Sequence, residues 1–267
     1  MKRDRFARVG PAAAGALSFV TSALIAAGLL SWWLSSPPFM QAGLRNPITP
    51  PEMSSLAGTG PGASAPAVNI EGSFAAGGGD PSSAGGSWPR FRGANFDNID
   101  GGATALASSW GPGGPPVLWS LELGEGHGGA AVHMGRVYLL DYDEEKESDL
   151  LRCLSLDDGT ELWRRWYRTG AKRNHGISRT VPTVSDRYVL TMGPKCHVMC
   201  ADAETGDFLW GKDLVREYGT REPLWYTAQH PLLDGDVAVI APGGRALMIG
   251  VDSRTGNVLW ETPNDRG

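Results

Sequence analysis

An eleven-residue segment occurs three times in the last 115 residues, and this repetition constrains the fold more than any other feature. Each copy ends on a tryptophan, 47 or 50 residues after the previous one, and the copies are residues 153–163, 200–210 and 250–260. In every copy a small residue lies ten positions before the tryptophan, a glycine four before it and a leucine one before it. Repeats of this period are typical of propellers and solenoids. The chain is therefore expected to stack copies of one small unit.

Short strands are predicted on both sides of each turn in the repeats. The runs 150–156 and 161–167 alternate or are apolar enough for strands. Upstream of each copy lies another pair of short strands, with turns at residues 134–135, 185–187 and 234–236. Each period thus holds four antiparallel strands, which is one blade of a β-propeller. We expect an all-β domain of about three to four such blades over residues 88–267, with a meander sandwich as the alternative.

Three kinds of residue in the repeats are expected to join one blade to the next. The Asp-Gly or Thr-Gly pair is a turn signal, because glycine adopts the positive φ of a tight hairpin at little cost. The tryptophan is a large apolar plate for a neighbouring blade, and an aspartate lies eight positions before it in two copies. We assign structural, blade-docking roles to Trp163, Trp210, Trp260, Gly159, Gly206, Gly256, Asp202 and Asp252.

The pattern small-x-Asp-x-x-Thr-Gly-x-x-x-Trp resembles the tryptophan-docking motif of the PQQ-binding-like β-propeller repeat proteins, in the quinoprotein alcohol dehydrogenase-like superfamily. Residues 200–210 and 250–260 fit best, whereas the first copy departs at Ser155. Further segments look like the planctomycete-type branch of this superfamily, at residues 88–95, 116–119, 135–138 and 231–235. The resemblance implies the propeller fold, but function only weakly, because one fold hosts enzymes and binding scaffolds.

For a quinoprotein dehydrogenase the resemblance would imply pyrroloquinoline quinone (PQQ) in the central funnel, a calcium ion, a catalytic aspartate and often two adjacent cysteines. The cysteines here are Cys153, Cys196 and Cys200, and none are adjacent. Cys196 and Cys200 are expected on one strand, about 13 Å apart, which is too far for a disulfide. Cys153 and Cys200 are expected to be small packing residues. We assign no catalytic, cofactor-binding or metal-binding residue, and PQQ with calcium rests on the resemblance alone.

The N-terminus has the pattern of a signal anchor. Residues 1–11 are basic and are expected to be cytoplasmic, whereas residues 12–34 are 23 mostly apolar residues without a charge. Such a run is long enough for a transmembrane helix, and the preceding positive charges place the rest of the chain outside the cytoplasm. The propeller is therefore expected in the periplasm or another extracytoplasmic space. A cleaved signal peptide is the alternative, although its apolar region is usually only about 7–15 residues.

A low-complexity segment follows the expected anchor. Between residues 43 and 87, 30 of 45 residues are Gly, Ala, Pro or Ser, and four are charged. Such a segment buries too little apolar surface to offset its chain entropy. We therefore expect a disordered linker. The later acidic run, residues 141–149, is expected to be a solvated hairpin loop, with a weak calcium site as the alternative.

Charge and length limit the remaining possibilities. The formal net charge is −5, so the chain lacks the basic surface that nucleic-acid binding needs. Only 180 residues follow the expected linker, whereas the resemblance implies a closed ring of about eight blades. We expect a C-terminally truncated chain, with subunits that complete one another or an unusually small ring as the alternatives.

The function expected from these features is that of a membrane-tethered extracytoplasmic binding or scaffold domain. Its partner would be an unknown protein, glycan or small molecule at the propeller face. The N-terminal helix would anchor the chain in the inner membrane, and no nucleic-acid partner is expected. The alternative is a PQQ-dependent dehydrogenase that oxidises alcohols or sugars. A polysaccharide- or peptide-binding module is a third class, because Trp225 and Tyr226 could stack on sugars.

Overall fold

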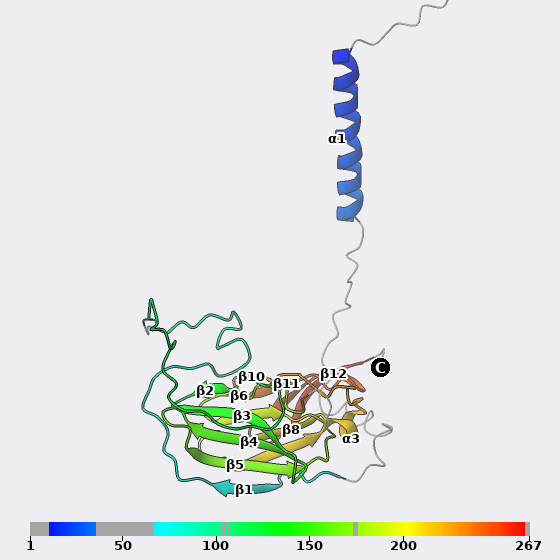
Figure 1. Cartoon of the computed structure of the whole chain (residues 1–267). Helices are drawn as coiled ribbons and strands as arrows, with labels where there is room; N and C mark the ends of the chain where they lie inside the picture. Colours follow the sequence, from blue (N-terminus) through cyan, green and yellow to red (C-terminus); the bar gives the residue numbers. More distant parts are fainter. Residues whose placement is uncertain (1–10, 36–66, 103–104, 106, 173–175, 265–267) are drawn as a thin grey trace, which may run out of the picture. The chain divides into compact units, whose positions relative to one another are not determined.

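The computed structural model describes residues 11–35, 67–102, 105, 107–172 and 176–264 of the chain. The chain forms two compact units, residues 1–45 and residues 46–267. The first unit contains helix α1, Pro11–Ser35, drawn in blue in Figure 1. In the second unit, strands make up most of the regular secondary structure among the described residues.

The helix predicted at residues 12–34 is present as α1. The structure describes the side chains of residues 20–32 of this helix. Among the described residues, no helix combines the length and hydropathy required to cross a membrane. The transmembrane helix expected from the sequence is therefore not found.

Three antiparallel sheets form the described part of the second unit, and we call them blades 1 to 3 (Figure 1). Blade 1 has the order β1-β5-β4-β3-β2, with β1 Ser73–Ala76, β2 Ala131–His133, β3 Arg136–Asp143, β4 Ser148–Ser155 and β5 Glu161–Arg168. Blade 2 consists of β6 Thr183–Val184, β7 Tyr188–Met192, β8 His197–Asp202 and β9 Phe208–Asp213. Blade 3 consists of β10 Leu232–Asp234, β11 Val237–Ile240, β12 Ala246–Asp252 and β13 Val258–Pro263. The predicted four-stranded blades and their turns are confirmed.

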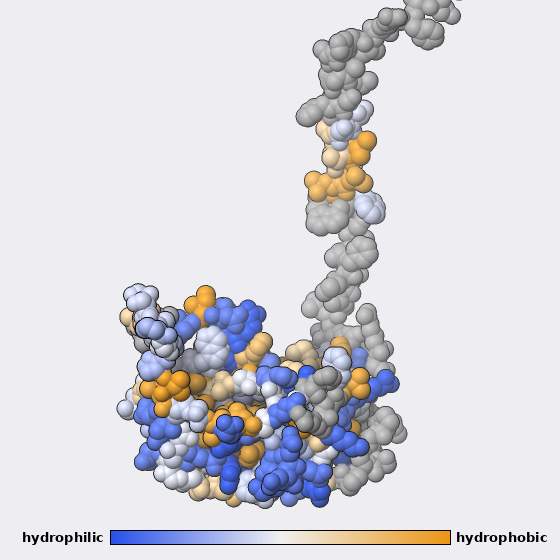
Figure 2. All heavy atoms as spheres, viewed as in Figure 1, coloured by the Kyte–Doolittle hydropathy of each residue, from blue (hydrophilic) through white to orange (hydrophobic). Residues whose placement is uncertain are grey.

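The blades follow one another with their first strands side by side. Strand β6 contacts both β2 and β10, so successive blades meet along their inner strands, as in a propeller. A short helix, α3 Leu214–Tyr218, leads from blade 2 toward blade 3. It is capped by the side chain of Asp213 and ends at Gly219, whose φ is 68°. Figure 2 shows that the visible face of this unit is largely hydrophilic, with apolar patches among the polar side chains.

The small residue of each repeat lies directly across the ladder from its tryptophan. The aligned pairs are Cys153–Trp163, Cys200–Trp210 and Gly250–Trp260. A methyl group on Gly250 would lie 2.2 Å from the indole of Trp260, which explains why this position must stay small. In each blade a register shift follows directly after the small residue. The repetition in sequence therefore corresponds to a repeated bulge and a repeated indole position.

The expectation of a disordered linker up to residue 87 is wrong for its last part. Strand β1 pairs antiparallel with β5, from Ser73 opposite Trp166 to Ala76 opposite Trp163. Ile70 is buried and packs in the cluster that blades 1 and 2 share. Close approach is possible because Gly77 carries no side chain: a methyl there would lie 1.8 Å from the carbonyl oxygen of Glu161. The start of the linker, residues 43–66, lies outside the described residues.

The three cysteines are free and buried. Cys153 and Cys200 are both fully buried within the apolar clusters, which confirms the prediction of packing residues. Cys196 does not share a strand with Cys200, because it ends the turn before β8 with a φ of 64°. Burial raises the pKa of the Cys196 thiol to about 12, so this thiol stays protonated at neutral pH.

Candidate functional site

Each of the two junctions between blades holds a tryptophan from the earlier blade. The indole Nε1 of Trp163 in blade 1 donates to the carbonyl of Glu204 in blade 2, at 3.0 Å. The indole of Trp210 in blade 2 donates to the carbonyl of Ser253 in blade 3, at 2.7 Å. Both tryptophans are almost fully buried. At both junctions the tryptophan of the earlier blade thus bonds to the backbone of the next blade.

The repeat glycines lie directly under these indoles. Gly206 and Gly256 have φ values of 76° and 75°, the left-handed region that glycine occupies without strain. A methyl at Gly206 would lie 2.6 Å from Trp163, and a methyl at Gly256 would lie 2.7 Å from Trp210. The glycines thus serve both the turn and the contact with the neighbouring blade.

The repeat aspartates shape the docking turns. The Asp252 carboxylate accepts hydrogen bonds from the backbone N–H groups of Arg254 and Thr255 and from the Thr255 hydroxyl, at 3.0, 2.8 and 2.9 Å. Asp202 makes the equivalent bonds with Glu204 and Thr205. The Thr255 hydroxyl and the backbone donors hold the pKa of Asp252 below its usual value. These bonds hold the turns that follow Asp202 and Asp252, and a role of the two aspartates in docking stays a prediction.

Of the remaining two docking residues, Gly159 has a partner that the sequence did not pair with it, the indole of Trp119. The indole of Trp119 packs against Gly159, where a methyl group would lie 2.6 Å from the ring. The Nε1 of this indole donates to the carbonyl of Leu156 at 3.0 Å. The sequence contained a signal for Trp119 as a further docking tryptophan, because Trp119 follows Val-Leu as Trp260 does. Trp260 itself is half-buried and makes no indole hydrogen bond within the described residues.

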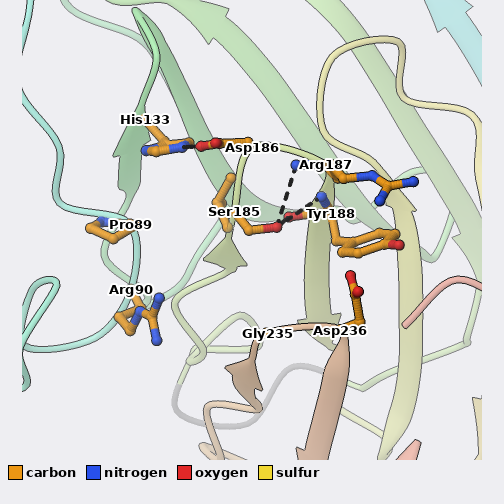
Figure 3. Close-up of a pocket in the computed structure, with 10 residues that line it drawn as sticks. Pro89, Arg90, His133, Ser185, Asp186, Arg187, Tyr188, Gly235 and Asp236 are labelled. Carbon is orange, nitrogen blue, oxygen red and sulfur yellow. Dashed lines mark hydrogen bonds and ion pairs between the residues drawn. The ribbon is translucent and has the colours of Figure 1, made fainter. Parts of the chain in front are cut away.

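A pocket of about 370 Å³ opens where the inner turns of the three blades converge (Figure 3). The segment after the linker contributes Pro89 and Arg90, and blade 1 contributes His133 at the end of β2. The β6–β7 and β10–β11 turns supply the rest, Val184, Ser185, Asp186, Arg187, Tyr188, Gly235 and Asp236. The sequence predicted the turns at residues 185–187 and 234–236, but did not show that these turns meet.

The pocket contains donors and acceptors in close proximity. His133 Nε2 lies 2.7 Å from the carboxylate of Asp186, and this pair closes one side (Figure 3). Arg90 donates to the carbonyl of Leu233 at 3.3 Å, and its buried Nε has no hydrogen-bond partner among the described residues. Burial lowers the pKa of Arg90. The Asp236 carboxylate points toward Tyr188 (Figure 3). The pocket can therefore bind both carbonyl and N–H groups of a ligand.

Trp225 and Tyr226, the candidates for sugar stacking, lie outside this pocket. They belong to the connection between α3 and β10, where Trp225 is 56% exposed. The Tyr226 hydroxyl donates to the carbonyl of Lys172 at 2.6 Å, and its φ is 63°. The Tyr226 ring packs with Tyr142, Ala171 and Ile177. This ring therefore stabilises the loop connection, and glycan stacking at these residues stays a prediction.

A buried carboxyl lies at the junction of blades 1 and 2, within the acidic run that was expected to be a solvated loop. That expectation is wrong at the ends of the run, because residues 141–143 belong to β3 and 148–149 to β4. Asp149 accepts a hydrogen bond from the Tyr167 hydroxyl at 3.0 Å. A methyl at Gly193 of the β7–β8 turn would lie 2.4 Å from the same carboxylate. Burial raises the pKa of Asp149 to about 7.

The variant Asp149→Asn should remove a pH dependence of stability. Unfolded, this carboxyl ionises at about pH 4, whereas the folded group keeps its proton up to about pH 7. The folded state therefore binds more protons between these values, and this group's contribution to stability falls as pH rises through that window. Asparagine keeps an acceptor for Tyr167 but does not titrate. In urea unfolding, the variant should gain stability relative to wild type at pH 8 compared with pH 4.5. An equal difference at both pH values would contradict the assignment.

The described residues offer no cluster with metal-binding geometry. No group of three or more His, Cys, Asp or Glu side chains in that part of the chain is arranged to hold a metal ion. No residue was assigned to a metal or a cofactor from the sequence. The donor sets that the described residues do form are those of the pocket and of the docking turns.

Comparisons with known proteins agree with the repeats. Residues 146–267 match the family model described as outer membrane protein assembly factor BamB. No curated protein matches the chain. Similar solved structures include BamB from Moraxella catarrhalis, 18% identical over 53% of this chain and 40% of that chain, with a TM-score of 0.36. Another is the quinohemoprotein alcohol dehydrogenase from Comamonas testosteroni, 16% identical over 54% of this chain and 22% of that one, with a TM-score of 0.39.

The matched part of the chain therefore spans less than half the length of each of these solved structures. The docking turns of blades 2 and 3, with Trp163, Trp210 and Trp260, all lie within the segment that the family model covers. The chain therefore carries PQQ-like β-propeller repeats over residues 146–267.

Proposed function

We propose that the chain is a membrane-tethered, extracytoplasmic propeller domain that binds a segment of another polypeptide and acts as a scaffold. The observation that carries this proposal is the pocket formed by Arg90, His133 and the turns of blades 2 and 3. Its guanidinium and carboxylate groups match the carbonyl and N–H groups that alternate along a peptide backbone. The family model is described as an assembly factor, which supports binding to another protein.

Tethering is proposed from the N-terminal sequence. Residues 12–34 lack charged side chains and follow a basic segment, the order that places a helix in the inner membrane with its C-terminal end exported. The residues between the anchor and Val68 would then set the distance between membrane and propeller. Alkaline carbonate extraction of membranes tests this part: the full chain should stay in the membrane pellet, and its release into the supernatant would contradict it.

Photo-crosslinking tests the binding role. A photoreactive amino acid in place of Asp236, which is exposed and lines the pocket, should form an adduct with one defined polypeptide in intact cells. The matched control is the same amino acid in place of Glu145, an exposed residue of the β3–β4 turn at the opposite end of the strands from the β2–β3 turn. Replacing Arg90 with methionine should weaken the adduct at position 236, because the guanidinium is lost.

Two results would contradict the proposal. Equal adducts at positions 236 and 145, or none at position 236, would show that the pocket does not bind a polypeptide. Titration of the full chain with PQQ and calcium addresses the dehydrogenase alternative. Micromolar PQQ binding together with dye reduction by alcohols or sugars would replace the scaffold role with an oxidoreductase.

A further inference from the structure

We propose that Ser87, His133 and Asp186 form a nucleophilic site that hydrolyses short-chain carboxylic esters. The Ser87 hydroxyl oxygen lies 2.9 Å from His133 Nδ1, and His133 Nε2 lies 2.7 Å from a carboxylate oxygen of Asp186. A serine bonded to a base, and a base bonded to a carboxylate, are the contacts that nucleophilic catalysis by a serine requires. The site shares His133 and Asp186 with the pocket, but the inference does not depend on a polypeptide that binds there.

The bond to Asp186 gives His133 the form that a general base needs. An ionised carboxylate only accepts hydrogen bonds, so Nε2 of the neutral imidazole carries the proton. Nδ1 then presents its lone pair, and the Ser87 hydroxyl donates to it. The serine-protease triad uses the two ring nitrogens in the opposite sense. Either nitrogen can act as the base, because the bond of one nitrogen selects the tautomer of the other.

The nucleophile and the base are held on two paired segments. Ser87 directly precedes Trp88, and the backbone of Trp88 exchanges two hydrogen bonds with that of Val132, at 2.7 and 2.9 Å. Val132 belongs to β2, and His133 is the next and last residue of this strand. The separation of the hydroxyl and the imidazole is therefore set by backbone pairing, which is the kind of support that a preorganised site requires.

The carboxylate is positioned by blade 2. The carbonyl of Pro89 accepts a hydrogen bond from the Val184 N–H at 2.8 Å, so the segment that pairs with β2 also bonds to β6. Asp186 follows two residues later, in the β6–β7 turn. Within this turn the Ser185 hydroxyl accepts a hydrogen bond from the Tyr188 N–H at 3.1 Å. The same short segment thus joins blades 1 and 2 and places the carboxylate against the imidazole.

The surroundings of the three side chains suit a small ester. Ser87 is exposed, whereas the His133 side chain is 18% exposed. The adjoining pocket of about 370 Å³ has Val184 and Tyr188 in its lining, which offers apolar surface to a short acyl chain. The Arg90 guanidinium lines the same pocket (Figure 3). A positive charge there favours the oxyanion that forms when a serine attacks a carbonyl.

Ester hydrolysis at this site takes two balanced steps. The Ser87 oxygen bonds to the ester carbonyl carbon while its proton moves to His133 Nδ1, and Asp186 balances the charge of the imidazolium. The imidazolium returns that proton to the departing alkoxide as the ester C–O bond breaks, so an alcohol leaves and Ser87 is acylated. A water molecule then adds to the acyl carbon with His133 again as the base. The carboxylic acid leaves and the Ser87 hydroxyl re-forms.

Labelling of the full chain with an alkyl fluorophosphonate tests the proposal, because this reagent phosphonylates activated serine hydroxyls and loses fluoride. Mass spectrometry should find the adduct on Ser87 of wild type, and Ser87→Ala should lose both the adduct and the hydrolysis of p-nitrophenyl acetate. His133→Gln and Asp186→Asn should each slow labelling at least about 100-fold. Asp186→Glu keeps a carboxylate and should recover labelling that Asp186→Asn loses. The control is Ser83→Ala, which removes another exposed serine and should change nothing.

Three results would overturn the proposal. They are a wild-type chain without an adduct on Ser87, an adduct that forms equally fast in His133→Gln and Asp186→Asn, and hydrolysis of p-nitrophenyl acetate that Ser87→Ala leaves unchanged. Circular dichroism of each variant checks the fold. Ser87 is exposed and the Asp186 side chain is 80% exposed, so their variants keep the test valid if His133→Gln loses structure.

Discussion

Replacing Trp210 with alanine should lower the free energy of unfolding of the second unit by about 3–5 kcal/mol, the range for large-to-alanine changes in a core. The side chain is 6% exposed, packs in the cluster between blades 2 and 3, and donates to the Ser253 carbonyl at 2.7 Å. Its removal leaves a cavity at the junction and an unpaired carbonyl. Both losses fall on the contact that joins the two blades.

Trp260→Ala is the matched control for this prediction. It changes the equivalent tryptophan in the next copy of the repeat, but Trp260 is half-buried and has no indole hydrogen bond within the described residues. Its replacement should therefore cost about 1 kcal/mol, near the centre of the range for single substitutions. Urea unfolding followed by circular dichroism measures both variants, at a protein concentration below any self-association. Equal losses at the two positions would mean that the indole contributes only to its own blade.

Gly206→Ala should destabilise the second unit by about 2–5 kcal/mol, from two causes that add. Alanine in the left-handed region costs about 1–2 kcal/mol, and Gly206 has a φ of 76°. The added methyl would also lie 2.6 Å from Trp163 and 2.9 Å from Phe74, and overpacking of this kind costs about 1–3 kcal/mol. The substitution thus disturbs both the turn and the docked indole.

Gly235→Ala separates the two causes. Gly235 has a φ of 57°, but a methyl there meets no atom within 4 Å. This variant should lose only the conformational part, about 1–2 kcal/mol. The difference between the two glycine variants in urea unfolding then measures the clash with Trp163. If Gly235→Ala lost as much free energy of unfolding as Gly206→Ala, then Gly206 would be required for the turn alone and not for the contact with Trp163.

The blade boundaries could be predicted because every blade repeats the same short-range chemistry. The turn glycines, the aspartates that bind N–H groups within three residues, and the small residue opposite the tryptophan are local requirements. They leave the same marks in each copy, as Asp202 and Asp252 show. The strand bounds around Trp163, Trp210 and Trp260 follow from them.

Strand β1 could not be predicted in the same way. Its pairing with β5 joins Ser73 to Trp166, and nothing within the Gly/Ala/Ser-rich segment specifies that distant edge. The useful signal was the pair of large apolar residues Ile70 and Phe74. Ile70 is buried against blade 2, and Phe74 lies against the guanidinium of Arg165. Composition alone describes such a segment as a linker, because backbone pairing needs no particular side chain.

The pocket was also hidden from the sequence. The turns at residues 134–135, 185–187 and 234–236 were predicted, but the approach of Asp236 and Arg187 to His133 and Arg90 depends on how the blades rotate relative to one another. That rotation is set by many small contacts at the junctions. Trp119 is an intermediate case, since its Val-Leu-Trp context resembled β13, whereas its partner Gly159 lies 40 positions further along the chain.

A double-mutant cycle between Trp210 and Gly256 tests the docking of one blade on the next most directly. A methyl at Gly256 would lie 2.7 Å from the Trp210 side chain, so Gly256→Ala should cost less once Trp210 is alanine. Urea unfolding of wild type, both single variants and the double variant should give a coupling of about 1–3 kcal/mol, the size of the clash that is relieved. Losses that add to within about 0.5 kcal/mol would show that the two side chains do not meet and would contradict the docked arrangement.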